Sequence, residues 1–482
     1  MRIAIIGLGC SGTLVLRSLV DFLQEDDPIE LLLFESETQL GAGLPYGRVF
    51  NHDSFLLNMQ TSTLGADPRR PREFVEWLAG RAPSSEIDSS SYVERTRMGD
   101  YLAHLLQKSL ASLQRLRIRY EIVREEVGDI HVRGKEYSLF SGTQTYTVDR
   151  VILAVGHLKK RERITRSPRY IANPYHDLAR VQAIPVNARV GVIGTKLTAV
   201  DIAILLRSRG IGQIALFSGS GRLPLIRGVR PAEQQLPAVP KPEGRSLRAF
   251  VRSIRQQLAA HGAPAEYSGF MSGLSEAARI ERELEQAQSS RLWHTLLDES
   301  KEFIDDYWQK LSAFHKRLFL RKYQGLWMSY RHPMPPANAR KIAAMLRDGS
   351  LQVHGGYRGV TEHADGTLTV QVRDTAIELD YLIDASGTPA DVRDIDSRLL
   401  HNLMRAGIVS RCEFGGIEVD PATHRLRPSS GIYAIGHLTR GRLFYVSALE
   451  RLALHASVIA GDVLLAMETQ AQELQQPIAE IA

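Results

Sequence analysis

Cysteine is scarce in this sequence. Only two of the 482 residues are cysteines, Cys10 and Cys412, and they form no C-x-x-C pair. A disulfide framework, a zinc ribbon and a redox-active disulfide are therefore not expected. Thiol–disulfide exchange is not the chemistry that this sequence predicts.

Long apolar runs and clustered charges are also lacking. No segment approaches the roughly 20 apolar residues of a membrane span, and the apolar run around Ile3 leaves no room for a secretory leader. The net charge is +6, but the basic residues are scattered and form no tail or stripe typical of nucleic-acid binding. We expect a cytoplasmic protein with no membrane span, no nucleic-acid partner and no metal site.

Three glycines near the N-terminus have the spacing of a nucleotide-binding turn. The segment RIAIIGLGCSGTLVLRSL begins as an apolar strand, carries Gly7, Gly9 and Gly12 at G-x-G-x-x-G spacing, and continues with helical periodicity. Such a turn leaves helix N–H groups facing a pyrophosphate. Strand, turn and helix together predict a dinucleotide site.

The segment after this turn favours FAD over NAD. A second strand, IELLLFE, ends at Glu35, whose carboxylate would accept hydrogen bonds from ribose hydroxyls. The glycine-rich GAGLPYG, which contains Tyr46, and a long polar loop follow instead of an immediate return to a βαβ rhythm. A loop here suits a flavin, whose ring must be reached and covered; the alternative is a surface insertion.

Two distant stretches share one plan. Residues 118–157 and 351–388 each alternate strands with glycine-containing turns and end in an apolar strand followed by a glycine, Gly156 and Gly387. Each is typical of a small β-meander that delivers the chain to a buried parallel strand. Two such returns indicate two nucleotide-binding domains.

The second domain would begin at VGVIGTKLTAVD, residues 190–201. Gly194, Lys196 and Ala199 take the three fingerprint positions. The next strand, QIALFSG, is followed by Ser220 and Arg222 where an NAD site would more often offer an acid, and an arginine suits the 2′-phosphate of NADPH. Lys196 leaves two possibilities open: its ammonium pairs with phosphate, or its side chain fills the turn and the site is vestigial.

Charged segments of helical period fill residues 236–345 and predict a helical insertion that shapes a substrate pocket. Within it, GLWMSYRHPMPP gathers aromatic and cationic residues, among them Arg331 and His332. Their role is either aromatic packing at a helix end or the lining of a site for an acidic substrate or for NADPH.

The C-terminal part returns to the first domain. A strand, GIYAIGH, ends at Gly436 and His437, and a long helix follows. The N-terminus of that helix would stabilise a reduced, anionic flavin ring. His437 stands where two-dinucleotide flavin enzymes often have an acid that contacts the ribityl chain.

The predicted fold is α/β, with two Rossmann-like dinucleotide-binding domains of the three-layer ββα type and a helical insertion. The expected ranges are 1–175 for the first part of the FAD domain, 176–235 for the first part of the NAD(P) domain, 236–345 for the insertion, 346–390 for the return strands of the NAD(P) domain, and 391–482 for the C-terminal part of the FAD domain.

In its motifs the chain resembles a bacterial FAD/NAD(P)-binding oxidoreductase family. The motifs are GLGCSG, GAGLPYG, LLNMQTSTLGADP with FVEWL downstream, GTKLTAVD and LWMSYRHPMPP, in order along nearly the entire chain. That family is distantly similar to the flavin N-hydroxylases of ornithine and lysine. The resemblance implies FAD binding and places Asn58 at the flavin edge, but it implies no particular substrate.

The residues expected at each cofactor follow from these motifs. For FAD they are Gly7, Gly9, Gly12, Glu35, Tyr46, Asn58, Val127, Gly156, Gly436 and His437; for NADPH they are Gly194, Lys196, Ala199, Ser218 and Arg222. The candidates for contact with substrate are Asn58, Arg331 and His332.

The leading hypothesis is an FAD-dependent, NADPH-using monooxygenase of a small molecule of acidic or amino-acid-like character. Most of that chemistry belongs to the cofactor, so no catalytic triad is expected. A flavin dehydrogenase or reductase that does not activate oxygen is the first alternative. A nucleotide-binding protein without turnover is the second, because Lys196 and His437 depart from the usual residues.

Overall fold

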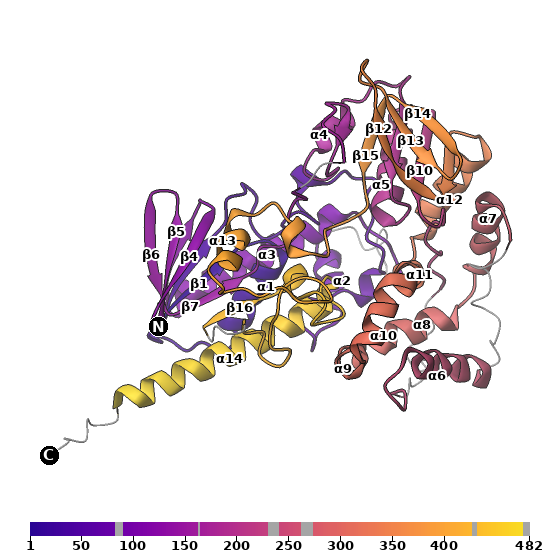
Figure 1. Ribbon diagram of the computed structural model, residues 1–482. Coiled ribbons are helices and arrows are strands. Elements are labelled where there is room, and N and C mark those ends of the chain that lie inside the picture. The colour runs from indigo at the N-terminus through magenta and orange to yellow at the C-terminus, as the bar shows by residue number, and fades with distance from the viewer. Residues whose placement is uncertain (82–89, 162–163, 230–240, 262–272, 427–430, 476–482) are drawn as a thin grey trace.

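The computed structural model describes residues 1–81, 90–161, 164–229, 241–261, 273–426 and 431–475. Two parallel sheets lie side by side in the molecule, and a group of helices packs below the second (Figure 1). The long C-terminal helix α14 (Leu449–Gln475) runs beneath the first sheet and projects at one end.

The first sheet is parallel throughout and has the N-terminal strand at its centre. Its strands, in spatial order, are β16 (Ile432–Ala434), β7 (Arg150–Leu153), β1 (Arg2–Ile6), β2 (Glu30–Phe34) and β3 (Arg119–Val123). Four strands from the first 153 residues thus share a sheet with the C-terminal β16, because β16 pairs with β7.

Side chains that alternate along β1 build a core on each face of this sheet. Ile3 and Ile5 face a helical layer, whereas Ala4 and Ile6 face a β-layer, as the two-residue period of a strand requires. The helical layer contains α1 (Cys10–Val20), α3 (Arg95–Arg115) and α14; the β-layer contains β4 (Val127–Arg133), β5 (Glu136–Ser141), β6 (Gln144–Val148) and α13 (Arg398–Arg405).

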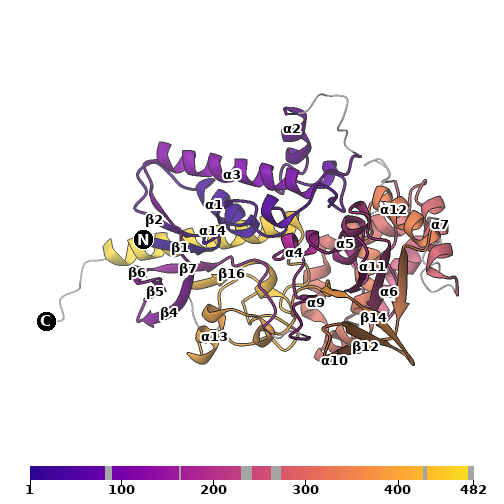
Figure 2. The ribbon, with the colours of Figure 1, turned by 90° about the horizontal axis from the view of Figure 1, so that it is seen from above.

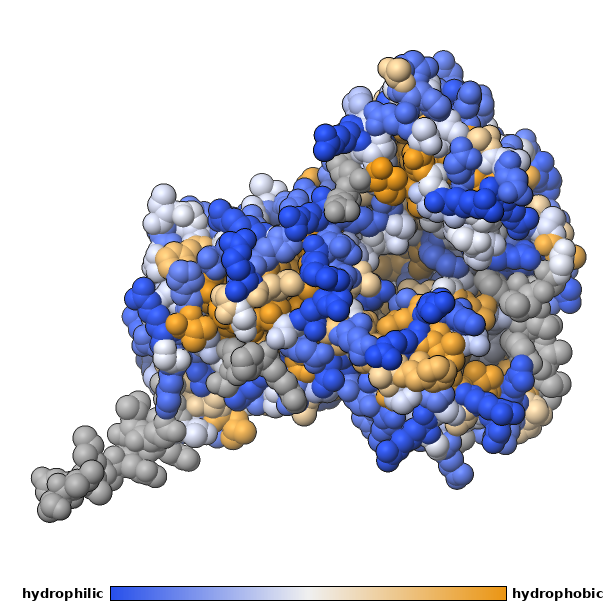
Figure 3. Space-filling view, viewed as in Figure 1, coloured by the Kyte–Doolittle hydropathy of each residue, from blue (hydrophilic) through white to orange (hydrophobic). Residues whose placement is uncertain are grey.

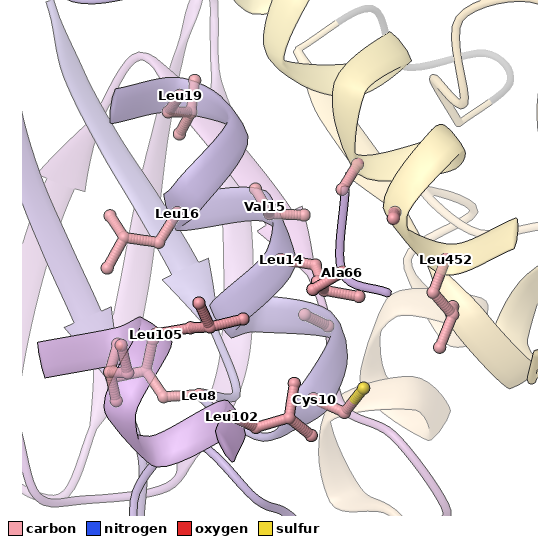
Figure 4. Close-up of a cluster of buried hydrophobic side chains, with 14 of the residues drawn as sticks. Leu8, Cys10, Leu14, Val15, Leu16, Leu19, Ala66, Leu102, Leu105 and Leu452 are labelled. Atoms are coloured by element: carbon pink, nitrogen blue, oxygen red, sulfur yellow. The ribbon is translucent and has the colours of Figure 1, made fainter. Parts of the chain in front are cut away.

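Helix α14 is long and apolar enough to cross a membrane by length and composition, over Leu449–Thr469. Its packing explains that composition. Leu452, Ala456 and Ala460 are buried in the core with α1, and Figure 4 shows Leu452 opposite Leu14 and Cys10. One face of the helix therefore lies in the core of the first domain, and the rest of this stretch is not buried.

The second sheet repeats the plan of the first. Its order is β8 (Tyr170–Ile171), β15 (Tyr381–Asp384), β9 (Arg189–Ile193), β10 (Gln213–Ser218) and β11 (Leu351–Gly355), again all parallel. One face carries α4 (Leu178–Gln182), α5 (Leu197–Ser208) and α12 (Pro336–Arg347); the other carries β12 (Tyr357–Glu362), β13 (Leu368–Val372) and β14 (Thr375–Leu379). The predicted class, two three-layer ββα domains, is confirmed.

Two elements lie outside the ranges that the sequence assigned to their domains. Strand β8 falls within 1–175 but pairs with β15, so the chain enters the second sheet earlier than expected. Helix α12 falls largely within 236–345, yet Ile342 and Ala343 pack in the core of the second domain with α5. A helix between β10 and the parallel β11 must cover that sheet, since parallel strands need such a crossover.

The remaining helices form the insertion, which lies beside α12 and below the second sheet (Figures 1 and 2). Two aromatic clusters hold it together, and one of them includes Tyr445 of the C-terminal segment. The Trp308 indole N–H donates to the Gly441 carbonyl at 2.8 Å, which ties the insertion to the first domain. Its helices are α6 (Leu247–Ala260), α7 (Glu276–Gln286), α8 (Leu292–Glu299), α9 (Ile304–Lys310), α10 (Ala313–Leu318) and α11 (Gln324–Arg331).

Candidate functional site

The first glycine turn lies at the carboxyl edge of the first sheet, where β1 gives way to α1. Gly7 has φ +96°, and a Cβ there would stand 2.5 Å from the Ala154 carbonyl oxygen of β7's extension. A Cβ on Gly12 would stand 1.9 Å from the Gly7 carbonyl oxygen, because α1 starts directly over the turn. Only glycine fits either position without opening the turn.

The second glycine of this turn has a different reason. A Cβ on Gly9 would lie 3.0 Å from the Cα of Gly43, which belongs to the GAGLPYG loop. The sequence explained Gly9 by the approach of a pyrophosphate; the structure adds the close approach of this loop. The loop and the turn are therefore built against each other.

In the second domain, the first glycine of the turn has the same surroundings as its counterpart in the first domain. Gly194 has φ +118°, and its Cβ would stand 2.6 Å from the Ala385 carbonyl oxygen, the counterpart of Ala154. The Gly194 N–H donates to Phe217 at 2.7 Å, as the Gly7 N–H donates to Phe34 at 2.8 Å. The segment after β10, GSGRLP, is also rich in glycine, and side chains are accommodated at Lys196 and at the fully buried Ala199.

Lys196 is the residue that begins α5, and its side chain does not fill the turn. Its ammonium contacts the Ser329 hydroxyl of α11 and lies 3.4 Å from the Arg222 carbonyl oxygen. Burial and, to a smaller extent, the charge of Arg279 lower the pKa of Lys196 to about 8. The structure thus brings Lys196 toward Arg222, the other residue expected at the coenzyme phosphate.

Arg222 lies in an ion-pair group at the edge of the second sheet. Its guanidinium is 3.0 Å from a Glu276 carboxylate oxygen, and Arg279 pairs with the same carboxylate at 2.5 Å. Ser218 lies nearby, where its hydroxyl accepts from the Gly221 N–H at 2.9 Å. Two arginines share one carboxylate here, which leaves an excess of positive charge where a 2′-phosphate was expected.

Two histidines meet where the glycine-ended strands of both domains converge. His157 follows Gly156 and His437 follows Gly436, and their ring centroids are 3.8 Å apart. His157 also shares a hydrogen bond of 3.1 Å with Thr388, which follows Gly387 in the second domain. Burial lowers the pKa of His157 to about 4 and holds that of His437 well below its usual value, so both rings are neutral at pH 7.

His437 supplies a direct test of whether the site fits FAD. Both of its ring nitrogens are buried, and neither has a hydrogen-bond partner among the described residues. A Cβ on Gly436 would stand 3.2 Å from the Ser11 hydroxyl at the start of α1, so His437 lies beside the first turn. Buried polar atoms without a hydrogen-bond partner reduce the stability of the folded protein. A polar ligand such as the ribityl chain of FAD would satisfy them, and the residues present fit that cofactor.

The other residues expected at FAD differ in their contacts and burial. Glu35 accepts hydrogen bonds from the Leu8 N–H at 2.9 Å and the Glu37 N–H at 3.0 Å. Tyr46 packs against the core of the first domain, and burial raises the pKa of its phenol. Asn58 is half-buried in the loop after η1 (Arg48–Phe50). The Val127 side chain is buried in the β-layer core, so only its backbone is left for a cofactor.

Arg331 and His332 lie at the end of α11, shortly after Ser329, which contacts Lys196 of the second turn. Arg331 is 3% exposed, pairs with Asp298 at 3.0 Å and lies over the Tyr445 ring at 5.0 Å. Burial and the neighbouring Arg331 lower the pKa of His332 to about 3. Arg331 is thus held by a carboxylate, which the sequence motif did not reveal.

Sequence reasoning missed several residues of these groups. His157, Thr388, Arg227, Asp298 and His294 belong to no spacing motif, and only the fold brings them together. The position of His157 directly after the glycine of a return strand was the one available signal. Within the part of the chain that the structure describes, no group of three or more potential metal ligands is found.

Comparisons with known proteins agree with this geometry. Residues 4–158 match the family described as FAD-NAD(P)-binding, so the N-terminal part is an FAD-NAD(P)-binding domain. The uncharacterized protein YdhS from Escherichia coli (strain K12) is 24% identical over 42% of this chain and 39% of its own length. The chain thus spans about two fifths of the curated relative that it matches.

Solved structures with the same fold extend over almost the entire chain. An ornithine N-hydroxylase from Kutzneria sp. 744 has a TM-score of 0.60 and 16% identity, with 96% of this chain and 99% of that chain covered. The bacillithiol disulfide reductase of Staphylococcus aureus has a TM-score of 0.50 and 12% identity, with coverage of 97% and 98%. Together with the family match, these findings show an FAD-NAD(P)-binding domain within a fold that these structures share.

Proposed function

We propose that the protein is an NADPH-dependent FAD monooxygenase that oxygenates a small molecule. The duplicated turn supports the two cofactors: Gly7 and Gly194 both have a positive φ, and they make equivalent hydrogen bonds and equivalent close approaches to a carbonyl. FAD, when bound, accepts a hydride from the nicotinamide and passes the electrons to oxygen or to another acceptor. A cytoplasmic location belongs to this proposal.

The burial of the two cysteines argues against disulfide reduction as the activity. Cys10 begins α1 beside the first turn, but its side chain packs in the core with Leu452 (Figure 4). Burial raises the pKa of the Cys10 thiol to about 12 and that of Cys412 to about 11. A thiolate is the reactive form in disulfide exchange, and neither residue forms one near neutral pH.

The protein's own residues have limited tasks in this proposal. The turn around Gly7, Gly9 and Gly12 holds the pyrophosphate of FAD, and the His437 ring donates to or accepts from its ribityl chain. Lys196 and Arg222 hold the coenzyme phosphates of the second domain. The helical insertion covers the reacting edge and limits the access of water, which favours transfer of oxygen to the substrate.

Oxygen reactivity separates this proposal from a flavin reductase. The FAD-loaded protein is reduced with NADPH without air and then mixed with oxygenated buffer in a stopped-flow spectrometer. We expect the flavin absorbance to change in at least two phases. The first phase should give a spectrum that is neither that of oxidised nor that of reduced flavin. When substrate is absent, peroxide should be released only in the later phase. Free reduced FAD is the control. A single-phase return to oxidised flavin, with rapid transfer to an added quinone, would instead support the reductase.

A further inference from the structure

A cluster of buried charges lies where three parts of the chain meet, apart from the two glycine turns. Arg227 from the segment after β10 and Asp298 from α8 form an ion pair of 2.6 Å. The second carboxylate oxygen of Asp298 lies 3.0 Å from Arg331 of α11. All three side chains are less than a tenth exposed. Two guanidinium groups thus share one carboxylate, and Glu450 is the other carboxylate that acts on Arg331.

A narrow cleft opens beside this cluster. Its lining includes Met59, Gln60, Arg227, His294 and Asp298. Met59 follows Asn58, the residue expected at the flavin edge, and the Tyr445 ring under Arg331 belongs to the segment that leads into α14. The cleft therefore adjoins the elements that surround the flavin site, and it rests on the insertion that was expected to shape a substrate pocket.

The unsatisfied atoms of the cluster are all hydrogen-bond donors. The Nε atoms of Arg227 and Arg331 are buried and have no partner among the described residues. Arg227 directs another N–H at the Met59 sulfur, 3.0 Å away, and sulfur is a weak acceptor. The strong acceptor at the cleft is the Asp298 carboxylate, and each of its oxygens is already engaged by an arginine.

His294 adds a donor to this set. It is 5% exposed, and its Nδ1 accepts from the Gly228 N–H at 3.3 Å. Burial and the neighbouring arginines hold the pKa of His294 well below its usual value, so the ring is neutral and its single proton lies on Nε2. That Nε2 atom is buried and unpartnered among the described residues.

We propose that this cleft is an anion subsite, which binds the carboxylate of a small-molecule substrate through Arg227 and the Nε2–H of His294. A planar guanidinium matches the two oxygens of a carboxylate. Arg331 is a positioning residue: it binds the second oxygen of Asp298, so this one carboxylate is divided between two guanidinium groups. The inference rests on the proposed function for its substrate, and it names the substrate's chemical class as anionic.

The test is a binding titration of the oxidised, FAD-loaded protein with sodium propionate, in the absence of coenzyme. Tryptophan fluorescence reports binding, because the Trp293 and His294 ring centroids are 3.6 Å apart. We expect saturable binding of propionate and none of its uncharged analogue propionamide. Arg227→Gln should weaken binding about tenfold or more, the usual cost of a charge-assisted contact. Asp298→Asn should tighten binding, since it removes the opposing charge.

The control is Arg207→Gln, which removes an exposed ion pair with Asp348 and should leave binding unchanged. Equal binding of propionate and propionamide, or unchanged binding in Arg227→Gln, would overturn the subsite. If that variant does not fold, the wild type decides: equal binding of propionate and propionamide overturns the proposal. Tighter, Arg227-dependent binding of inorganic phosphate than of propionate would assign the cleft to a coenzyme phosphate and overturn the carboxylate. Because no turnover is involved, failure here leaves the tests of reduction and oxygen reactivity intact.

Discussion

At the scale of single residues, the two turns differ in how much space surrounds equivalent positions. A Cβ at Gly12 would collide with the Gly7 carbonyl oxygen at 1.9 Å, whereas Ala199 occupies the same position of the second turn and is fully buried. The glycine fingerprint is therefore a requirement for close helix packing in the first domain. The second turn is wider and accepts a methyl group.

This difference predicts the effect of a single methyl group. Gly12→Ala should destabilise the protein by about 3 kcal/mol or more, because α1 must move away from the turn to accommodate it. The variant should also lose FAD. Gly461→Ala is the matched control, since a Cβ there meets no atom within 4 Å in α14. Urea unfolding and the flavin absorbance of the purified proteins measure both effects; retained FAD and unchanged stability in Gly12→Ala would contradict the turn geometry.

Lys196 predicts a pH dependence of coenzyme binding. Its pKa is lowered to about 8 by burial, so the ammonium is charged at pH 7 and loses its proton as the pH rises through that value. If this charge holds a coenzyme phosphate, the Kd for NADPH should rise between pH 7 and pH 9. Lys196→Arg keeps its charge over this range and should flatten the profile. Parallel profiles of the wild type and the variant would show that Lys196 does not contact the coenzyme.

At the scale of elements, α14 joins the C-terminal part of the chain to the first helix. Ala456 and Ala460 are fully buried. Their small side chains let α14 approach α1 closely. Leu465, on another side of the same helix, is 62% exposed. The apolar composition of α14 thus serves a packed interface along only part of its surface.

The interface predicts a contrast between two substitutions in one helix. Ala456→Leu should destabilise the protein by about 1–3 kcal/mol through overpacking against α1. Leu465→Gln should change stability by no more than about 0.5 kcal/mol, as is usual for exposed positions. Thermal unfolding of both variants measures the contrast. Equal effects would mean that α14 is not packed as the structure has it.

Much of the element order could be predicted from the sequence because its signals are local. Apolar strands that end in glycine mark both domains, and the three-layer class follows from two meanders that precede return strands. The domain to which α12 and β8 belong could not be predicted, since Ile342 and Tyr170 find their partners only through strand pairing and packing. The candidate site shows the same limit. The glycines of its turns could be predicted from their spacing, but the contact between His157 and His437 joins residues 280 positions apart in sequence, and no spacing rule links them.

At the scale of the whole molecule, two ion pairs connect the nucleotide domains. Arg95, at the start of α3, reaches Asp201 of α5 at 2.6 Å, and Lys160 reaches the buried Asp384 at the end of β15 at 2.6 Å. Arg95 also donates to the Tyr175 hydroxyl at 2.9 Å. The two cofactor turns are therefore held in a fixed relation, which hydride transfer between their ligands requires.

These contacts predict coupled unfolding of the two domains. Asp201→Asn should cost about 3–5 kcal/mol, because it leaves the buried Arg95 without its counter-charge. The double variant Arg95→Met with Asp201→Asn should cost less than the sum of the single ones. A double-mutant cycle by urea denaturation measures the difference. Strict additivity would show that this pair does not join the domains.

The central claim is that two nucleotide domains form one oxidoreductase in which NADPH reduces FAD. Anaerobic titration of the FAD-loaded protein, followed by the loss of the oxidised flavin absorbance, tests it most directly. We predict bleaching by NADPH that is faster than by NADH, and a smaller difference between the two coenzymes in Arg222→Ala. A yellow protein that neither coenzyme bleaches would contradict the claim and favour a nucleotide-binding protein without turnover; equal rates for both coenzymes would contradict the 2′-phosphate role of Arg222.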